Sequence, residues 1–394
     1  MIFMPHKDYG RVGWFLGPGG YSESFPQAIQ IREFWKAEIL PDDIFASSAG
    51  VLNGWNPLQA SRILKEHFSS PWAVYDLSPD IKKVIDKTLK AYKSIPAPLL
   101  KKHETWLESW RDWSNYRKNY KSSKEFFTDL FHILGYAKQI LTSIPSLPIT
   151  ANPSPQELVP LLEMLLAELR ILGLNKTESL LDPSPLFEKL RKLVDLQSIL
   201  DRDISFNILA RSRNEHHIFS CGTPLSADAM NNLKRKYKIN EIKTKDDLVA
   251  ASMASSAFSP YFPRRKINGR FYGDSGEQNP FPVKCLYDAG CDTVFAFVKN
   301  YEIYSNADEL NIPESIEENR DVSMETIFKY QRERIFEYTR QNGKKDPYII
   351  FPAPLHPDFG TLWVSLEAIE YAEKAEKEAI RKWLKDNLNI EAKD

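Results

Sequence analysis

The stretch Val12-Gly-Trp-Phe-Leu-Gly-Pro-Gly-Gly-Tyr-Ser22 decides the fold. It begins with a short apolar run, typical of a buried strand, and continues into a glycine-rich loop. Residues 27–38 then carry apolar side chains at helical spacing, and residues 44–46 form a second short apolar run. Two strands joined by one helix form a parallel β-α-β unit, so the sequence predicts an α/β domain.

A candidate nucleophile follows the second strand, in Ala46-Ser-Ser-Ala-Gly50. A serine at a strand-to-helix elbow lies on a tight, strained turn that projects its hydroxyl into solvent. The residues two before and two after it must be small, because the strand and the helix approach each other there. Ala46 and Gly50 meet this requirement around Ser48, although glycine is more usual at the first position.

The glycine loop offers backbone donors for an anion, because glycines let N–H groups converge without obstruction by side chains. Pro18 has no N–H, so the donors are expected to be Gly19 and Gly20. The loop and Ser48 lie one β-α-β step apart and would emerge at the same end of the sheet, which predicts an oxyanion loop. A dinucleotide-binding loop is the alternative, but no acidic residue closes the second strand where that motif needs one.

A candidate base lies in Tyr272-Gly-Asp-Ser-Gly276, directly after a predicted hairpin that turns at Asn268-Gly269. An aspartate beside a serine hydroxyl can accept its proton as the hydroxyl attacks a carbonyl, and no imidazole is then needed. Asp274 is therefore the candidate base, and an aspartate that caps a turn is the alternative interpretation.

A histidine-containing triad is a second alternative. His356 follows Asp274 in the order expected of an α/β-hydrolase, but it lies in a loop flanked by prolines. His216 and His217 belong to a predicted hairpin of strands 204–210 and 217–220, and we expect them to point to solvent or to a backbone carbonyl.

The three motifs, in this order, resemble the patatin-like phospholipases. The likeness extends through residues 182–195 and 250–274 and covers residues 12–60 and 182–300. It implies a three-layer α/β/α sandwich and a Ser-Asp dyad that hydrolyses acyl esters of phospholipids or related lipids. By position, the resemblance makes Ser48 the nucleophile and Asp274 the base, and it places the oxyanion hole at the amides of Gly19 and Gly20. The residues expected to support these motifs are Gly17, Ala46, Gly50 and Gly276.

The sequence departs from the family pattern at four positions. Ala46 replaces the first glycine of the elbow, and Ser275 replaces the middle glycine of Asp-Gly-Gly. Tyr21 stands where the family usually has a basic residue, and Ser22 where it has glycine. The loss of a positive charge at Tyr21 bears on rate and head-group preference more than on the chemistry.

The chain divides into three predicted parts. Residues 1–76 form the first part of the core, residues 77–200 form a helical insertion or cap, and residues 201–394 complete the core. The last part contains further predicted strands at 293–298 and 348–351 and a closing amphipathic helix at 363–384.

The insertion contains a possible membrane-contacting region at residues 82–124. It has twelve Lys or Arg against four acidic residues, and Trp106, Trp110 and Trp113 share one face of a predicted helix. Tryptophans beside basic residues could rest on an anionic membrane surface. Packing of the same stripe onto the core is the alternative.

Composition excludes several classes. A net charge of −1 argues against a nucleic-acid partner, and no apolar run is long enough to span a membrane. The three cysteines, Cys221, Cys285 and Cys291, cannot all pair and show no metal-ligand spacing. We therefore expect a cytoplasmic protein, peripheral at membranes if the insertion contacts them, without a cofactor or metal.

The predicted function is a serine lipid acyl hydrolase of the phospholipase A type, working through an acyl-Ser48 intermediate. Acyl transfer to a lipid or protein acceptor is the first rival. The second is a catalytically weak lipid-binding protein that keeps the pocket, which the departures at Tyr21, Ala46 and Ser275 would suit.

Overall fold

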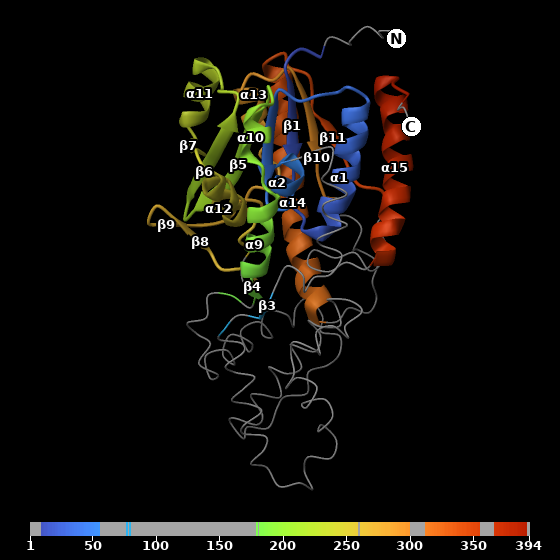
Figure 1. Ribbon diagram of the computed structural model, residues 1–394. Helices are drawn as coiled ribbons and strands as arrows, with labels where there is room; N and C mark the ends of the chain where they lie inside the picture. The colour runs from blue at the N-terminus through green and yellow to red at the C-terminus, as the bar shows by residue number, and fades with distance from the viewer. Residues whose placement is uncertain are drawn as a thin grey trace, which may run out of the picture.

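The computed structural model describes residues 9–55, 181–258, 261–299, 312–354 and 366–391, together with residues 76, 77, 79 and 179. Within these residues, a nine-stranded sheet carries helices on both faces (Figure 1). The predicted α/β class and three-layer α/β/α architecture are confirmed.

The central sheet is mostly parallel, in the order β11-β10-β1-β2-β5-β6-β7. Antiparallel pairing enters this order only between β5 and β6, which form the predicted hairpin. Helices cover both faces, so β1, β2 and β10 are buried along their whole length, which explains their continuous apolar sequence. The strands in this order are β1 (Val12–Leu16), β2 (Asp43–Ser47), β5 (Ser205–Ser212), β6 (Glu215–Gly222), β7 (Tyr237–Glu241), β10 (Thr293–Phe297) and β11 (Tyr348–Ile350).

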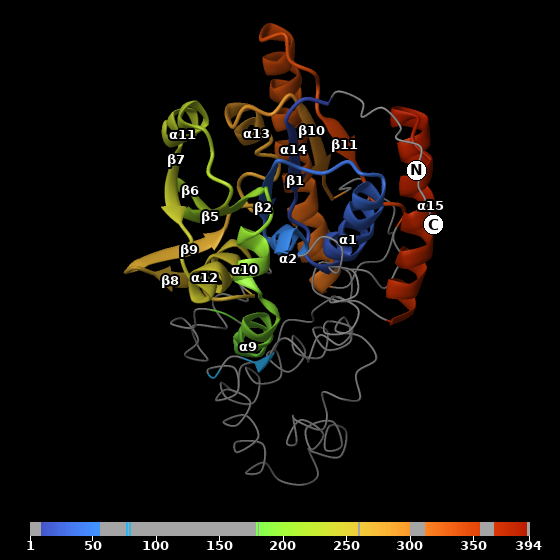
Figure 2. The same ribbon diagram turned by 45° about the horizontal axis from the view of Figure 1, so that its top comes forward.

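A second hairpin joins β8 (Arg265–Ile267) to β9 (Arg270–Asp274). Its turn residues Asn268 and Gly269 have φ values of 48° and 79°, as a type I′ turn requires, so this predicted hairpin is confirmed. The tip of β9 runs to the edge of β5 (Figure 2). This pairing places Asp274 beside Ala210 of β5, inside the sheet.

The helices divide between two hydrophobic clusters, and successive residues of β1 face opposite clusters: Trp14 and Leu16 one, Phe15 the other. The first cluster includes α1 (Tyr21–Lys36), α2 (Gly50–Trp55), α9 (Ser184–Leu193), α10 (Leu196–Leu200), α12 (Lys245–Ser255) and α15 (Leu366–Leu388). The second includes α11 (Ala227–Lys234), α13 (Lys284–Asp288) and α14 (Ile312–Gln341). None of the helices in the described ranges is long and apolar enough to cross a membrane.

Two short strands join the borders of the predicted insertion. β3 (Asp76–Leu77) pairs antiparallel with β4 (Leu181–Asp182). Most of residues 77–200 lie outside the described residues, including the tryptophan stripe and the basic region 82–124. Leu186, Leu190 and Ile199 from the end of that range are buried in the first cluster. The domain boundaries at 76 and 200 stay predictions.

Candidate active site

The serine elbow forms as the sequence predicts. Ser48 directly follows β2 and adopts φ of 53°, a left-handed conformation that costs free energy for any residue with a side chain. Its N–H donates a 2.9 Å hydrogen bond to Ser255 Oγ at the end of α12. The sequence predicted that Ser48 projects into solvent. The residue is instead buried, with only 9% of its surface exposed.

Small residues around the elbow are required by contacts. Ala46 is fully buried in the core. A side chain on Gly50 would overlap the carbonyl of Leu16, and its Cβ would lie 2.9 Å from Gly17 O, which is closer than real Cβ atoms come. Gly50 therefore allows α2 to pack directly beneath the glycine loop.

The candidate base lies at the end of β9. Asp274 is 2% exposed, and its Oδ1 accepts a 2.7 Å hydrogen bond from the N–H of Gly276. A side chain on Gly276 would overlap Pro18. The loop after Asp274 thus packs against the glycine loop, and two of the three motifs are in contact.

Strand pairing places the candidate nucleophile and the candidate base on the same edge of β5. β2 ends where Ser47 pairs with Leu209, and on that edge the next residue, Ala210, pairs with Asp274. The other edge of β5 is occupied by β6, where Ala210 pairs with His217. β9 therefore takes over the edge that β2 leaves, and Asp274 lies just beyond the strand end from which Ser48 turns away.

A chain of hydroxyl groups ties the two motifs together. Ser275 Oγ donates to the carbonyl of Leu209 at 3.0 Å, and the same carbonyl accepts from Ser255 Oγ at 2.6 Å. Ser47 Oγ lies 2.7 Å from Ser275 Oγ. Because the Ser275 proton is already directed at Leu209, Ser47 is the donor in this contact.

Sequence reasoning missed this chain. It treated Ser275 only as a departure from the family pattern, and it gave no role to Ser47 or Ser255. The run of small residues before Ser256 was the available signal, but which hydroxyl meets which carbonyl depends on strands that are remote in sequence.

The glycine loop also takes its predicted place, between β1 and α1. The N–H of Gly17 donates to Phe297 O at 2.9 Å, and a Cβ on Gly17 would lie 2.9 Å from that oxygen. Gly20, with φ 62° and ψ −144°, adopts a conformation that favours glycine, and no side chain caps the helix that follows. α1 therefore begins directly at the glycine loop, and the free N–H groups of its first turn favour a negative charge next to this loop.

A buried amide pair braces the loop from below, and sequence reasoning missed it as well. Asn53 Nδ2 donates to Gln27 Oε1 at 2.8 Å and to Ser24 O at 3.0 Å. Gln27 Nε2 donates in turn to Phe297 O at 3.2 Å. These bonds connect α1, α2 and β10 beneath Gly17.

The dinucleotide alternative does not fit the strand ends. Asp43 is the first residue of β2 and Asp42 precedes it, so both lie at the opposite end of the strand from the elbow. Asp43 pairs with Arg11 through bonds of 2.7 and 3.0 Å, and Asp42 accepts the N–H of Val12 at 2.6 Å. Both carboxylates therefore serve the structure of the sheet.

The histidines in the described residues lie elsewhere. His217 is 3% exposed, lies 3.2 Å from Asn240 Nδ2 and packs edge-on against Tyr272, so the contact with solvent or a carbonyl that was expected of this residue is wrong. Burial, together with the charge of Arg270, lowers the pKa of His217. Burial also lowers the pKa of His216. His356 lies outside the described residues.

No group of three or more His, Cys, Asp or Glu in the described ranges is arranged to hold a metal ion. The three cysteines are unpaired and buried, and burial raises the pKa of Cys221 to about 12. This thiol therefore stays protonated near neutral pH.

Comparison with known proteins points to one family. The family model "Patatin-like phospholipase" matches residues 19–287. Among solved structures, the crystal structure of VipD from Legionella pneumophila aligns with a TM-score of 0.38 and 12% identity, covering 95% of this chain and 67% of that one. A search of curated protein sequences found no match.

Proposed function

The chain belongs to the patatin-like phospholipase family, and we propose that it hydrolyses acyl esters of lipids with Ser48 as nucleophile and Asp274 as base. One observation carries the choice of residues. Ser47 and Asp274 pair with consecutive residues, Leu209 and Ala210, on one edge of β5. The strained turn at Ser48 and the contact of Pro18 with Gly276 support the same assignment.

In the proposed reaction, Ser48 Oγ attacks the ester carbonyl while Asp274 accepts the hydroxyl proton. The tetrahedral oxyanion is stabilised by the amides of Gly19 and Gly20, and loss of one such donor commonly costs about 2.7–4 kcal/mol of barrier. The ester C–O bond then breaks, and the leaving alcohol takes the proton from Asp274. A water molecule, deprotonated by Asp274, attacks the acyl-serine, and the bond from the acyl carbon to Ser48 Oγ breaks as Ser48 Oγ takes the proton back from Asp274. The fatty acid is released and the free serine is restored.

The first test concerns the nucleophile. We expect Ser48→Ala to abolish hydrolysis of a p-nitrophenyl ester and covalent labelling by a fluorophosphonate, because the attacking oxygen is gone. Ser198→Ala, which removes an exposed hydroxyl from α10, is the matched control and should retain both. Both proteins should show the wild-type circular dichroism spectrum. Undiminished labelling of Ser48→Ala would mean that another residue is the nucleophile.

Asp274→Asn tests the base with the least change in shape. It should lower kcat strongly, since an amide cannot accept the proton, and the exposed Asp228→Asn in α11 should leave kcat unchanged.

A further inference from the structure

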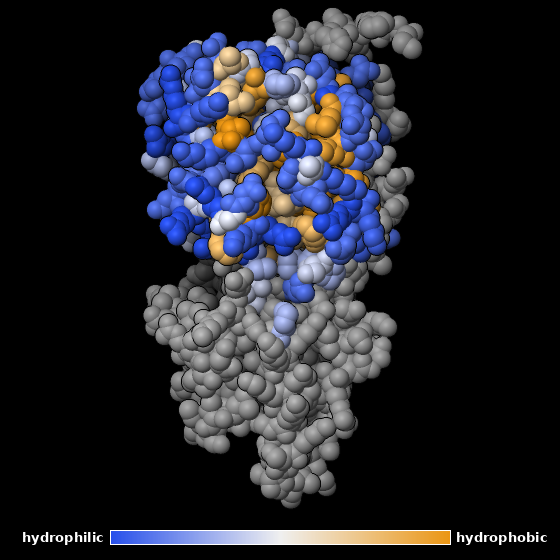
Figure 3. All heavy atoms as spheres, turned by 60° about the vertical axis from the view of Figure 1, so that its left-hand side comes forward, coloured by the Kyte–Doolittle hydropathy of each residue, from blue (hydrophilic) through white to orange (hydrophobic). Residues whose placement is uncertain are grey.

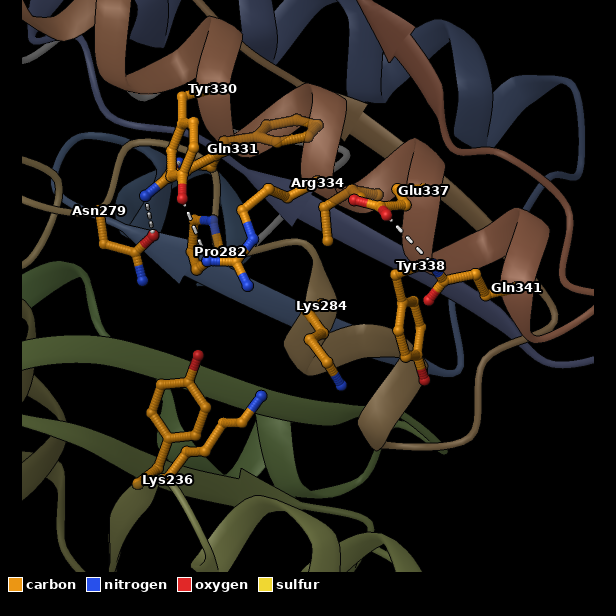
Figure 4. A pocket seen from close by; sticks show the side chains of 13 residues that line it. Lys236, Asn279, Pro282, Lys284, Tyr330, Gln331, Arg334, Glu337, Tyr338 and Gln341 are labelled. Carbon is orange, nitrogen blue, oxygen red and sulfur yellow. Dashed lines mark hydrogen bonds between the residues drawn. The ribbon is translucent and has the colours of Figure 1, made fainter.

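A surface cavity of about 600 Å³ lies between α14, the start of β7 and the loop that follows Asp274 (Figure 4). Its walls come from three parts of the chain that are remote in sequence: residues 236–237, residues 279–284 and the second half of α14. Its volume falls within the usual range for small-molecule sites. Nothing in the proposed hydrolysis uses it.

Positive charge is concentrated in this cavity. Lys236, Lys284 and Arg334 all line it, and Figure 4 shows their charged ends directed into the same space. Lys284 pairs with Asp288, whereas neither Lys236 nor Arg334 forms an ion pair with any described residue. Glu337 is the one acidic residue among the described lining residues, and it accepts a hydrogen bond from Gln341. The lining therefore has an excess of cations.

The crowding of these cations is unfavourable. The pKa of Lys236 is lowered, first by burial and then by the charge of Lys284, with a further contribution from Arg334 that Asp288 opposes. Like charges at close range destabilise each other's charged forms, and a bound anion reverses that effect. The charge of this cavity therefore favours a negatively charged ligand.

The other walls suit a ligand with an apolar part. Tyr237, Tyr330 and Tyr338 present aromatic rings, and Arg334 Nη1 donates to the Tyr330 hydroxyl at 3.3 Å. Gln331 Nε2 donates a hydrogen bond to Asn279 Oδ1 at 2.9 Å, and both side-chain amides line the cavity. Charge-assisted donors next to aromatic surfaces are the combination that binds an organic phosphate.

We propose that this cavity is a binding site for a phosphate ester that carries an aromatic or other apolar group. The phosphate contacts Lys236, Lys284 and Arg334, and the apolar group packs against the tyrosines.

The site adjoins the active-site loop. The N–H of Asn279 donates to Ser275 O at 3.0 Å, and the ring of Phe281 packs edge-on against Phe15 with 6.3 Å between centroids. A ligand in the cavity thus contacts the segment that holds Ser275 and Asp274.

Calorimetric titration of the full-length Ser48→Ala protein with phenyl phosphate tests the site without any ester turnover. We expect binding that weakens as salt is added. The double variant Lys236→Gln/Arg334→Gln should weaken binding by about tenfold or more, because it removes two charged donors. The matched control Lys234→Gln/Arg340→Gln removes two exposed cations from the neighbouring α11 and from α14 and should bind as before. Phenol, which has no phosphate, should not compete.

Two results would overturn the proposal: no binding of phenyl phosphate at millimolar concentration, or equal affinities of the two double variants. Arg334→Lys, which keeps the charge, should retain most of the affinity, and this separates loss of charge from loss of fold.

Vesicles distinguish the source of the phosphate. The two double variants are sedimented with phosphatidylcholine vesicles that contain phosphatidic acid. If only Lys236→Gln/Arg334→Gln loses sedimentation, the natural ligand is a lipid head group. If both variants sediment equally while their affinities for phenyl phosphate differ, it is a soluble phosphate ester.

Discussion

The hydroxyls of Ser47 and Ser275 connect the serine elbow with the loop that follows Asp274, the two halves of the proposed active site. Each serine is next in sequence to a proposed catalytic residue, both are buried, and their hydroxyls lie 2.7 Å apart. The carbonyl of Leu209 accepts hydrogen bonds from the hydroxyls of Ser275 and Ser255, so both of its lone pairs are used. A buried hydroxyl without a partner is costly, and this favours one arrangement of the elbow and the aspartate loop.

A double-mutant cycle tests this connection. Ser275→Ala leaves the Ser47 hydroxyl without its acceptor, so each single alanine variant should lower the free energy of unfolding by about 1–3 kcal/mol. The double variant should cost clearly less than the sum, because both partners are gone. Urea unfolding measures the cycle, and kcat for a p-nitrophenyl ester should fall in Ser275→Ala as the aspartate loop loosens. Strict additivity of the unfolding free energies would contradict the coupling.

At the scale of the elements, the packing of α15 on α1 includes two buried carboxyl groups, Glu33 and Glu376. Glu33 of α1 is fully buried, and Arg381 of α15 reaches it at 2.9 Å. Glu376 of α15 accepts bonds from Gln30 at 2.6 Å and from the N–H of Ala353 at 2.7 Å. Burial raises the pKa of Glu376 to about 7.

This raised pKa predicts how stability depends on pH. The pKa of the Glu376 carboxyl is 4.5 in the unfolded chain and about 7 in the folded protein, so the folded protein holds this proton more tightly. The protonated carboxyl therefore contributes fully to stability below pH 4.5, and this contribution is lost as pH rises through 7. The loss should be about 3 kcal/mol. Glu376→Gln should flatten this part of the profile in urea unfolding, whereas the exposed Glu378→Gln on the same helix should keep it. An unchanged slope in Glu376→Gln would assign the effect to another group.

The sequence predicted best the strands and turns whose residue pattern is compatible with only one local structure. β1, β2 and β10 are continuous apolar runs because both faces of the sheet are covered, and the Asn268-Gly269 turn needs two left-handed residues. α1 begins at Tyr21, earlier than the predicted residue 27, and Pro26 lies inside the helix.

The missed elements have weak patterns. β7 is an edge strand that mixes charged and apolar residues, on the largely hydrophilic face in Figure 3. α14 was missed because its sequence is mostly polar. Charged side chains on an edge strand prevent pairing with other chains, but they also hide the strand from a search for apolar alternation.

At the scale of the whole molecule, the proposed active site combines segments from residue 17 to residue 276. The turns at Ser48 and Gly20 could be predicted, because local backbone geometry needs particular residue types there, whereas the catalytic roles of Ser48 and Asp274 and the oxyanion role of Gly19 and Gly20 stay predictions. The sequence could not predict Ser255 or the Leu209 carbonyl, because these act through contacts that form only when β5 and α12 are in place.

The paired ends of the insertion predict that the core folds without it. Leu77 and Leu181 are neighbours in the β3–β4 pair. We expect a chain in which a short Gly-Ser linker replaces residues 80–178 to unfold cooperatively, within about 2 kcal/mol of the full chain, since closing a shorter loop changes the entropy little. Circular dichroism during urea unfolding measures this. A linker of scrambled sequence is the control, and a non-cooperative transition in both would show that the core needs the insertion.

The edge of β5 that β2 and β9 share allows Asp274 only discrete positions. Because strand register changes only in whole residues, Asp274 either lies opposite Ala210 or moves by about 3.4 Å with its side chain on the other face. Intermediate positions do not exist. The loops that join β6, β7 and α12 to their neighbours can therefore vary in length without moving the carboxylate, as long as β6 and Ser255 keep their contacts with β5.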